Sequence, residues 1–147
     1  MEGILNRKDR EERKVIEPDL RLNALSKVIV DCCFEVHNIL GPGLLESAYE
    51  ECLFLLLCER GLQVERQKFV DIKFKNHSVR NAYKIDLLVE NSIIIELKTV
   101  EKILPIHGAQ MITYLKLSDC QLGLLINFNV KMLKDGVKRY VSSSLRS

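Results

Sequence analysis

The 147-residue sequence lacks a long hydrophobic run, because no stretch of 18 or more apolar residues occurs in it. A membrane-spanning helix needs about 20 consecutive apolar residues. The N-terminal residues mix acids and bases where a signal peptide needs an apolar stretch. We therefore expect neither a membrane span nor an export signal, and we expect a cytoplasmic protein.

Paired cysteine motifs are also missing. The five cysteines are odd in number and show no C-x-x-C spacing, whereas zinc and redox motifs use such pairs and secreted disulfide frameworks use even numbers. They lie among aliphatic residues. We expect reduced, mostly buried side chains at Cys32, Cys33, Cys52, Cys58 and Cys120.

A large excess of one charge is absent, since the formal net charge is only +2. Strong non-specific nucleic-acid binders usually carry a heavier cationic excess. Local basic clusters do occur, and a solvated surface is the more common meaning of each: Arg66 with Lys68, and Lys131, Lys134 and Lys138 with Arg139.

The composition is that of one globular domain. Hydrophobic residues make up 47% and charged residues 29% of a chain whose length suits a single core. We find no internal repeat, low-complexity tract or linker. The expected division is a flexible, charged N-terminal arm over 1–18, one domain over 19–141, and a C-terminal tail over 142–147.

Three helices are predicted from apolar spacing and from their start and stop signals. The first follows Pro18 and Asp19 and ends before Gly41, and the second spans about 44–60 with Gly61 in the C′ position. Pro105 opens the third, over about 105–117.

Strands are predicted over 63–69, 70–74, 79–90 and 92–100, where β-branched and aromatic residues are frequent, and they suggest an antiparallel meander. A strand over 122–128 and a short basic hairpin or strand ending near Val141 complete the pattern. This order predicts an α/β fold, in which a mixed β-sheet is flanked by α-helices.

Two acids and a base emerge from aliphatic strands in the middle of the chain. Glu96 and Lys98 alternate with apolar residues, so they share one face of a strand about 7 Å apart. If a hairpin turns around Asn91, Asp86 lies nearly opposite Glu96. Converging carboxylates are usually resolved by a divalent cation, and Mg²⁺ suits such a site. Lys98 would orient a water nucleophile.

The strand pair alone favours a simpler interpretation, which is a set of charged side chains on a solvated sheet face. Three residues of the following helix, His107, Gln110 and Tyr114, line one helical face. Gln110 and Tyr114 form a Q-x-x-x-Y pattern suited to holding a phosphate. An amphipathic helix with a buried Tyr is the commoner meaning of that pattern, and His107 alone is typical of a cap or surface residue.

Gly43, Glu46 and Tyr49 form a further unusual element at the start of the second helix. Glu46 sits in the first turn, where the helix dipole favours an anion. Two interpretations stay open: Glu46 is a helix-terminal acid beside a core Tyr49, or Glu46 reaches into the same cleft as a further metal or water ligand.

Taken together, these landmarks resemble the GxxExxY protein family over about 20–140. The matching segments are V-H-N-I-L-G-P at 36–42, G-x-x-E-x-x-Y at 43–49, I-D-L-L-V at 85–89, I-E-L-K at 95–98, the Gln110 to Tyr114 pattern, and L-L-I-N-F at 124–128. That family is assigned to the PD-(D/E)XK nuclease superfamily, whose restriction-endonuclease-like core is a mixed sheet flanked by helices. Ile85 stands where the superfamily signature has proline.

The resemblance implies specific roles for six residues. Asp86 and Glu96 would be metal ligands, Lys98 the catalytic lysine, and Glu46 the acidic residue of the N-terminal helix. Gln110 and Tyr114 would form the motif shared with RecB-like exonucleases, and we group His107 with them as a substrate-binding candidate.

Two functional hypotheses follow. The first is a Mg²⁺- or Mn²⁺-dependent nuclease that acts on DNA in preference to RNA. The second is a catalytically silent module that keeps the nuclease fold for nucleic-acid or protein binding. Under either hypothesis the protein could form a homodimer.

Overall fold

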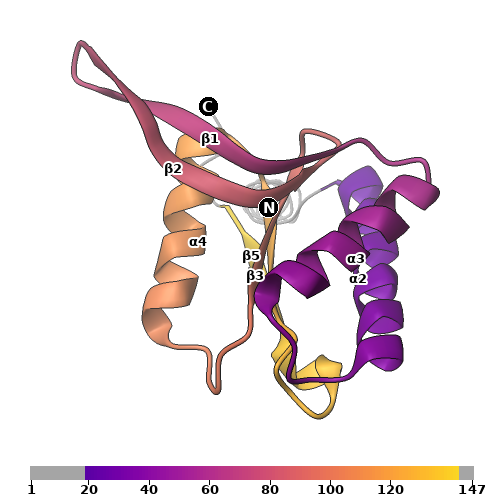
Figure 1. Cartoon of the computed structure of the whole chain (residues 1–147). Helices are drawn as coiled ribbons and strands as arrows, with labels where there is room; N and C mark the ends of the chain where they lie inside the picture. Colours follow the sequence, from indigo (N-terminus) through magenta and orange to yellow (C-terminus); the bar gives the residue numbers. More distant parts are fainter. Residues whose placement is uncertain (1–18, 143–147) are drawn as a thin grey trace, which may run out of the picture.

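In the computed structural model, which describes residues 19–142, five strands form one mixed sheet in the order β1-β2-β3-β4-β5 (Figure 1). Neighbouring strands are antiparallel except for β3 and β4, which are parallel. The strands are β1 (Val64–Phe74), β2 (His77–Val89), β3 (Ile93–Lys98), β4 (Leu122–Asn127) and β5 (Val137–Val141).

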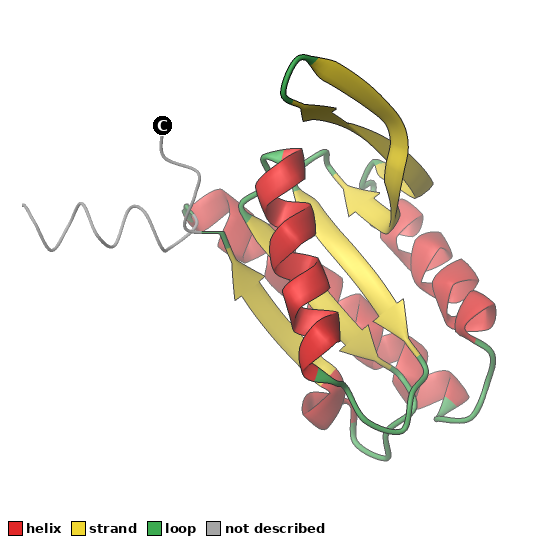
Figure 2. Cartoon of the chain, turned by 90° about the vertical axis from the view of Figure 1, so that its left-hand side faces the viewer, coloured by secondary structure: helices red, strands yellow, loops and turns green. Residues whose placement is uncertain are grey.

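Helices cover both faces of this sheet. α2 (Leu20–Leu40) and α3 (Glu46–Glu59) lie on one side, and α4 (Pro105–Ser118) lies on the other (Figures 1 and 2). α4 makes the crossover that two parallel strands require. Asp19 caps α2, since its Oδ1 accepts a hydrogen bond of 2.8 Å from the amide of Leu22.

The central strand β3 is buried on both faces because helices cover both. Ile93, Ile95 and Leu97 belong to the core beneath α2 and α3, whereas Ile94 packs in the second core with Met111 of α4. The alternation therefore places Glu96 and Lys98 on the same side of β3 as Ile94.

The predicted fold class is confirmed, and so is the meander, because β1, β2 and β3 are consecutive antiparallel strands. The prediction of separate strands over 63–69 and 70–74 is wrong. One 11-residue strand, β1, crosses both, because β2 pairs with it through the predicted break. The predicted basic hairpin or strand is a 3₁₀ turn, η1 (Leu133–Gly136), followed by β5.

The predicted arm over 1–18 lies outside the described residues, as do residues 143–147 of the predicted tail. Within the described part of the chain, no helix has the length and apolar character needed to cross a membrane. All five cysteines are free thiols. Three are buried, Cys52 is half-buried, and Cys58 is exposed, which is where the expectation of burial does not hold.

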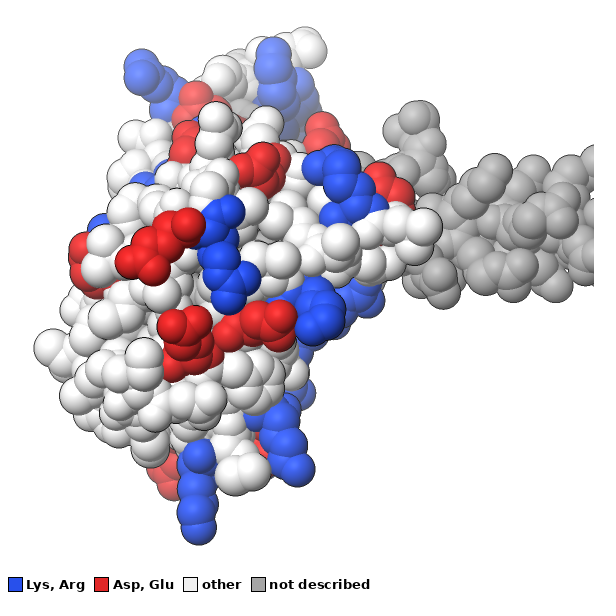
Figure 3. Space-filling view, turned by 90° about the vertical axis from the view of Figure 1, so that its right-hand side faces the viewer, with Lys and Arg blue, Asp and Glu red and all other residues white. Residues whose placement is uncertain are grey.

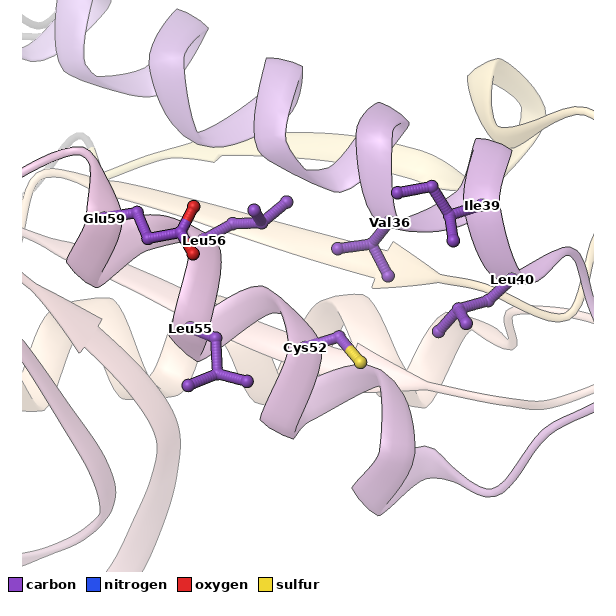
Figure 4. A pocket seen from close by; sticks show the side chains of 7 residues that line it. All are labelled: Val36, Ile39, Leu40, Cys52, Leu55, Leu56 and Glu59. Atoms are coloured by element: carbon purple, nitrogen blue, oxygen red, sulfur yellow. The ribbon is translucent and has the colours of Figure 1, made fainter.

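An apolar groove of about 220 Å³ lies between α2 and α3. Figure 4 shows side chains of both helices lining it, with Val36 and Leu40 from α2 and Cys52 from α3 among them. Among the residues of 19–142 that line it, Glu59 is the only charged one. On this side of the molecule acidic and basic side chains are interspersed, without a broad area of one sign (Figure 3). The groove therefore offers hydrophobic contacts rather than sites for charged ligands.

Candidate active site where β2 and β3 diverge

Asp86 and Glu96 lie where the ladder between β2 and β3 stops. The two strands pair only from Leu87 to Val89, and this register places Asp86 opposite Glu96, as the sequence predicts. Beyond that point, the carboxylates of the two acids accept hydrogen bonds from backbone amides of the opposite strand. The Asp86 amide donates to Glu96 Oε2 at 3.0 Å, and the Leu97 amide donates to Asp86 Oδ2 at 2.9 Å. Both carboxylates are thus fixed by main-chain donors.

Burial and mutual repulsion act on these acids. Glu96 is only 5% exposed. Burial, and then the nearby charge of Asp86, raise the pKa of Glu96 to about 8, although the Asp86 amide and Lys98 act in the opposite direction. An interior carboxyl with such a pKa indicates negative charge that is not compensated within the protein.

Glu46 reaches the same region from the start of α3. Burial raises its pKa, Asp86 raises it further, and Lys98 opposes this effect. Glu46 also raises the pKa of Glu96. The charges of Asp86 and Lys98 thus act on both Glu46 and Glu96. All four residues are among those predicted from the sequence.

Tyr49 explains how the G-x-x-E-x-x-Y pattern places Glu46. Its hydroxyl donates to the Gly41 carbonyl at 2.6 Å and accepts from the Leu44 amide at 3.1 Å, so it clamps the turn that leads into α3. Its ring is fully buried and stacks on Phe128 at 4.6 Å. Gly43 has φ 103°, which favours glycine. Tyr49 is therefore a core residue, as the first interpretation expects, and the role of Glu46 as a metal or water ligand stays a prediction.

The end of β3 is held by Asn127 of β4, a residue that is 1% exposed. Its side chain accepts a hydrogen bond from the Val100 amide at 3.1 Å and donates one to the Val100 carbonyl at 2.9 Å. Lys98 is half-buried, two residues before this clamp, opposite Asn127 in the parallel ladder. The backbone around the lysine is thus held in place by β4.

Sequence reasoning missed a polar network on the β1 side of Asp86. Gln67 Nε2 donates to Glu50 Oε1 at 2.7 Å and to Asp86 Oδ1 at 3.4 Å. Arg66 bonds both Glu50 and Glu51, at 3.2 and 2.8 Å. Arg66 is therefore not part of a free basic cluster. No local sequence pattern predicts the contacts of Glu50 and Gln67, because their partners are 16 to 19 residues away in the chain.

α4 contributes one aromatic hydroxyl to the site. Burial and the charges of Glu96 and Asp86 raise the pKa of Tyr114, so its hydroxyl stays a donor at neutral pH. Gln110 is half-buried on the same helical face, and its amide makes no hydrogen bond to other residues in 19–142. His107 lies farther toward the helix start, where its Nδ1 accepts from the Leu104 amide at 2.9 Å, as a cap does.

Comparison with known proteins bears on this geometry. A family model described as the PD-(D/E)XK nuclease superfamily matches residues 23–140, which include every site residue named above. The chain belongs to the PD-(D/E)XK nuclease superfamily. Membership of the GxxExxY family within this superfamily stays a prediction. No curated protein matches the chain.

One solved structure similar to this superfamily member is the crystal structure of a protein named SSO0001. It has 21% sequence identity and a TM-score of 0.45, and the alignment covers 66% of this chain. This chain spans about half of that protein, since 49% of its length is covered.

The assignment of the signature's acidic positions to Asp86 and Glu96, and of its lysine to Lys98, stays a prediction. Ile85, at the position of the signature proline, is 1% exposed and packs in the core beside α4. An apolar side chain there serves packing and leaves the neighbouring carboxylate in place.

Proposed function

We propose that this protein is a Mg²⁺- or Mn²⁺-dependent nuclease that hydrolyses phosphodiester bonds of DNA. The observation that carries the proposal is the pair of Asp86 and Glu96, whose carboxylates bond to each other's strand. The charges of Glu46 and Lys98 also act on Glu96, and the pKa of Glu96 is raised to about 8. Membership of a nuclease superfamily supports the reaction class. DNA as substrate and the individual roles of the residues are parts of the proposal.

The donor set fits a hard divalent cation. All the candidate ligand atoms are carboxylate oxygens, which Mg²⁺ and Mn²⁺ prefer over nitrogen or sulfur. Asp86 and Glu96 would hold the ion, and Glu46 would complete the shell directly or through water. When bound, such an ion acts as a Lewis acid on the phosphate and lowers the pKa of a coordinated water.

The protein's own side chains would then position the substrate and stabilise charge. Lys98 places an ammonium beside the carboxylates, where it orients the attacking water and offsets the negative charge that develops on phosphorus. Tyr114 keeps its proton and donates to a phosphate oxygen, and Gln110 offers a free amide from the same helical face. His107 retains its Nε2 for a contact at the edge of the site.

The test is hydrolysis of labelled single- and double-stranded DNA and of RNA by the purified protein with Mg²⁺, Mn²⁺ or EDTA. Glu96→Ala and Lys98→Ala should each lower the rate by at least about 100-fold. Glu101→Ala and Lys102→Ala are matched controls, because both residues are exposed in the bend that follows β3. Activity that survives either site substitution would sink the assignment.

A second function, the silent module, is favoured by one observation. Within residues 19–142 no three His, Cys, Asp or Glu side chains gather closely enough to hold a metal ion as they stand. A module that does not catalyse hydrolysis would need no preformed cluster of metal ligands. Calorimetric titration with Mn²⁺ separates the two functions, since the silent module predicts no binding that depends on Asp86 and Glu96.

A further inference from the structure

The β1–β2 hairpin continues well beyond the sheet that carries the site. β3 pairs only with residues Leu87 to Val89 of β2, so the remainder of β2 and its partners in β1 pair only with each other. We call residues 68–84 the ribbon. Figures 1 and 2 show its turn end projecting as a twisted two-stranded arm beyond α4 and the other strands, whereas Val70 and Tyr83, nearer the sheet, pack against the α4 core.

The ribbon concentrates positive charge. Among its 17 residues there are five cations and one acid, so its net charge is +4, whereas that of the whole chain is +2. The rest of the chain is therefore net acidic, and the small overall charge conceals a basic element. The five cations are Lys68, Lys73, Lys75, Arg80 and Lys84.

Most of this charge is free for a ligand. Lys68 pairs with Glu65 at 3.0 Å. Lys73, Lys75, Arg80 and Lys84 form no ion pair with any residue in 19–142. All four are exposed. Cations without an acidic partner keep their attraction for an external polyanion.

Aromatic side chains accompany these cations. Phe69 and Phe74 are 56% and 60% exposed, which is unusual for large apolar residues. Lys84 Nζ lies 5.7 Å from the centre of the Phe69 ring, and Lys75 Nζ lies at the same distance from that of Phe74. Ammonium groups held on aromatic faces match a ligand with alternating phosphates and apolar sugar or base surfaces.

The ribbon leads directly to the candidate site. Its last residue, Lys84, stands two positions before Asp86 in the same strand, and Tyr83 stacks on Tyr114 of α4 with ring centres 4.4 Å apart. At about 3.3 Å per residue, β2 extends roughly 30 Å from Asp86 to the turn of the ribbon, which corresponds to about nine phosphates along one DNA strand.

We propose that the ribbon binds duplex DNA that flanks the scissile phosphate. A two-stranded ribbon fits the major groove in width, and the free cations contact the phosphates on either side. The proposal rests on the nuclease function proposed above, because DNA is the ligand that it assumes. The ribbon would supply the substrate-binding surface that the catalytic residues do not provide.

The experiment measures binding apart from hydrolysis. Fluorescence anisotropy of a labelled duplex of about 20 base pairs is recorded in EDTA between roughly 50 and 200 mM salt. The ribbon variant is Lys73→Gln/Lys75→Gln/Arg80→Gln, which leaves Lys84 near the site intact. Its matched control is Lys131→Gln/Lys134→Gln/Lys138→Gln, three exposed lysines elsewhere.

The ribbon variant should bind at least about tenfold more weakly, with a salt slope smaller by about 2 to 3. The control should stay within about twofold of wild type. Equal affinity of wild type and ribbon variant, or equal losses in both variants, would overturn the proposal. It is also overturned if light scattering shows a wild-type dimer that the ribbon variant dissociates while DNA binding is unchanged.

A small substrate separates failure of this proposal from failure of the nuclease function. Hydrolysis of bis(p-nitrophenyl) phosphate with Mn²⁺ needs no ribbon, so the ribbon variant should hydrolyse it at the wild-type rate. If wild type does not hydrolyse this diester or DNA, the nuclease function fails, and ribbon-dependent DNA binding alone would uphold the inference.

Discussion

The backbone amide of Asp86 donates a hydrogen bond of 3.0 Å to the carboxylate of Glu96, a residue of the neighbouring strand. The Asp86 carboxylate in turn accepts from the Leu97 amide at 2.9 Å. Each acid therefore bonds to the other's strand at the point where the regular ladder ends. The two carboxylates are preorganised by main-chain contacts, although their charges repel each other.

The first prediction concerns the pH dependence of stability in the absence of metal. The pKa of Glu96 is about 8 in the folded protein and near its ordinary value of 4.5 when unfolded. Between these values the folded state binds more protons, so the free energy of unfolding falls as pH rises. Glu96→Gln should flatten this decline and make the protein more stable at pH 8 by a few kcal/mol, while abolishing activity.

Urea unfolding between about pH 5 and 8.5 in EDTA measures this effect. Glu101→Gln serves as the control, because it removes an exposed acid three residues beyond Lys98. Identical slopes of stability against pH in wild type and Glu96→Gln would contradict the assigned pKa.

The second prediction links metal binding to proton release. Near pH 7 most Glu96 side chains carry a proton, since their pKa is about 8. A divalent cation binds the carboxylate, so Mn²⁺ should displace nearly one proton per ion. Calorimetry in two buffers with different ionisation enthalpies counts these protons. Glu96→Gln should abolish the release, and heats that do not depend on the buffer in wild type would refute this link.

The helix bounds and the acidic pair could be predicted because local signals determine them. Asp19 and Gly41 delimit α2, and residue alternation around a turn at Asn91 places Asp86 opposite Glu96. Glu90 and Asn91 both have positive φ, as the tight hairpin turn requires. These features depend on residues close together in the chain.

The ribbon and the Glu50–Gln67 contact depend instead on register between distant segments. The ladder pairs Arg66 with Leu87 and Lys68 with Ile85, so Gln67 lies opposite Asp86. Gln67 has φ 50°, a conformation that its residue type does not signal. The sequence around Phe69 and Val70 likewise contains no sign that one strand continues. Non-local pairing decides these features, and residue type alone does not encode it.

The third prediction tests how the turn before α3 positions Glu46. Tyr49→Phe keeps the stack on Phe128 and removes both hydrogen bonds of the hydroxyl. Stability should fall by about 1 to 2 kcal/mol, because the Gly41 carbonyl and the Leu44 amide lose their partner. Activity should fall as well, since Glu46 follows this turn. Tyr140→Phe is the matched control for a lost hydroxyl, and equal urea midpoints of the two variants would contradict the clamp.

The fourth prediction concerns Gln67, which contacts both Glu50 and Asp86. Gln67→Ala removes a donor from Glu50, which is 6% exposed, and leaves a residue with a Cβ at φ 50°. Stability should fall by about 1 to 3 kcal/mol. Gln67→Gly also removes the donor but relieves the backbone, so it should be more stable than Gln67→Ala by a few tenths to about 1 kcal/mol.

Activity separates the two effects that Gln67 combines. Both variants release Asp86 Oδ1, so both should lose DNA hydrolysis by a similar factor, of about tenfold, despite their different stabilities. Gln63→Ala is the control, because its exposed side chain forms no hydrogen bond with residues in 19–142. If activity instead followed stability across the three variants, Gln67 would support only the fold. Equal impairment of the two Gln67 variants would show that the Gln67 amide orients the Asp86 carboxylate. This role would account for a residue with a strained backbone at this position.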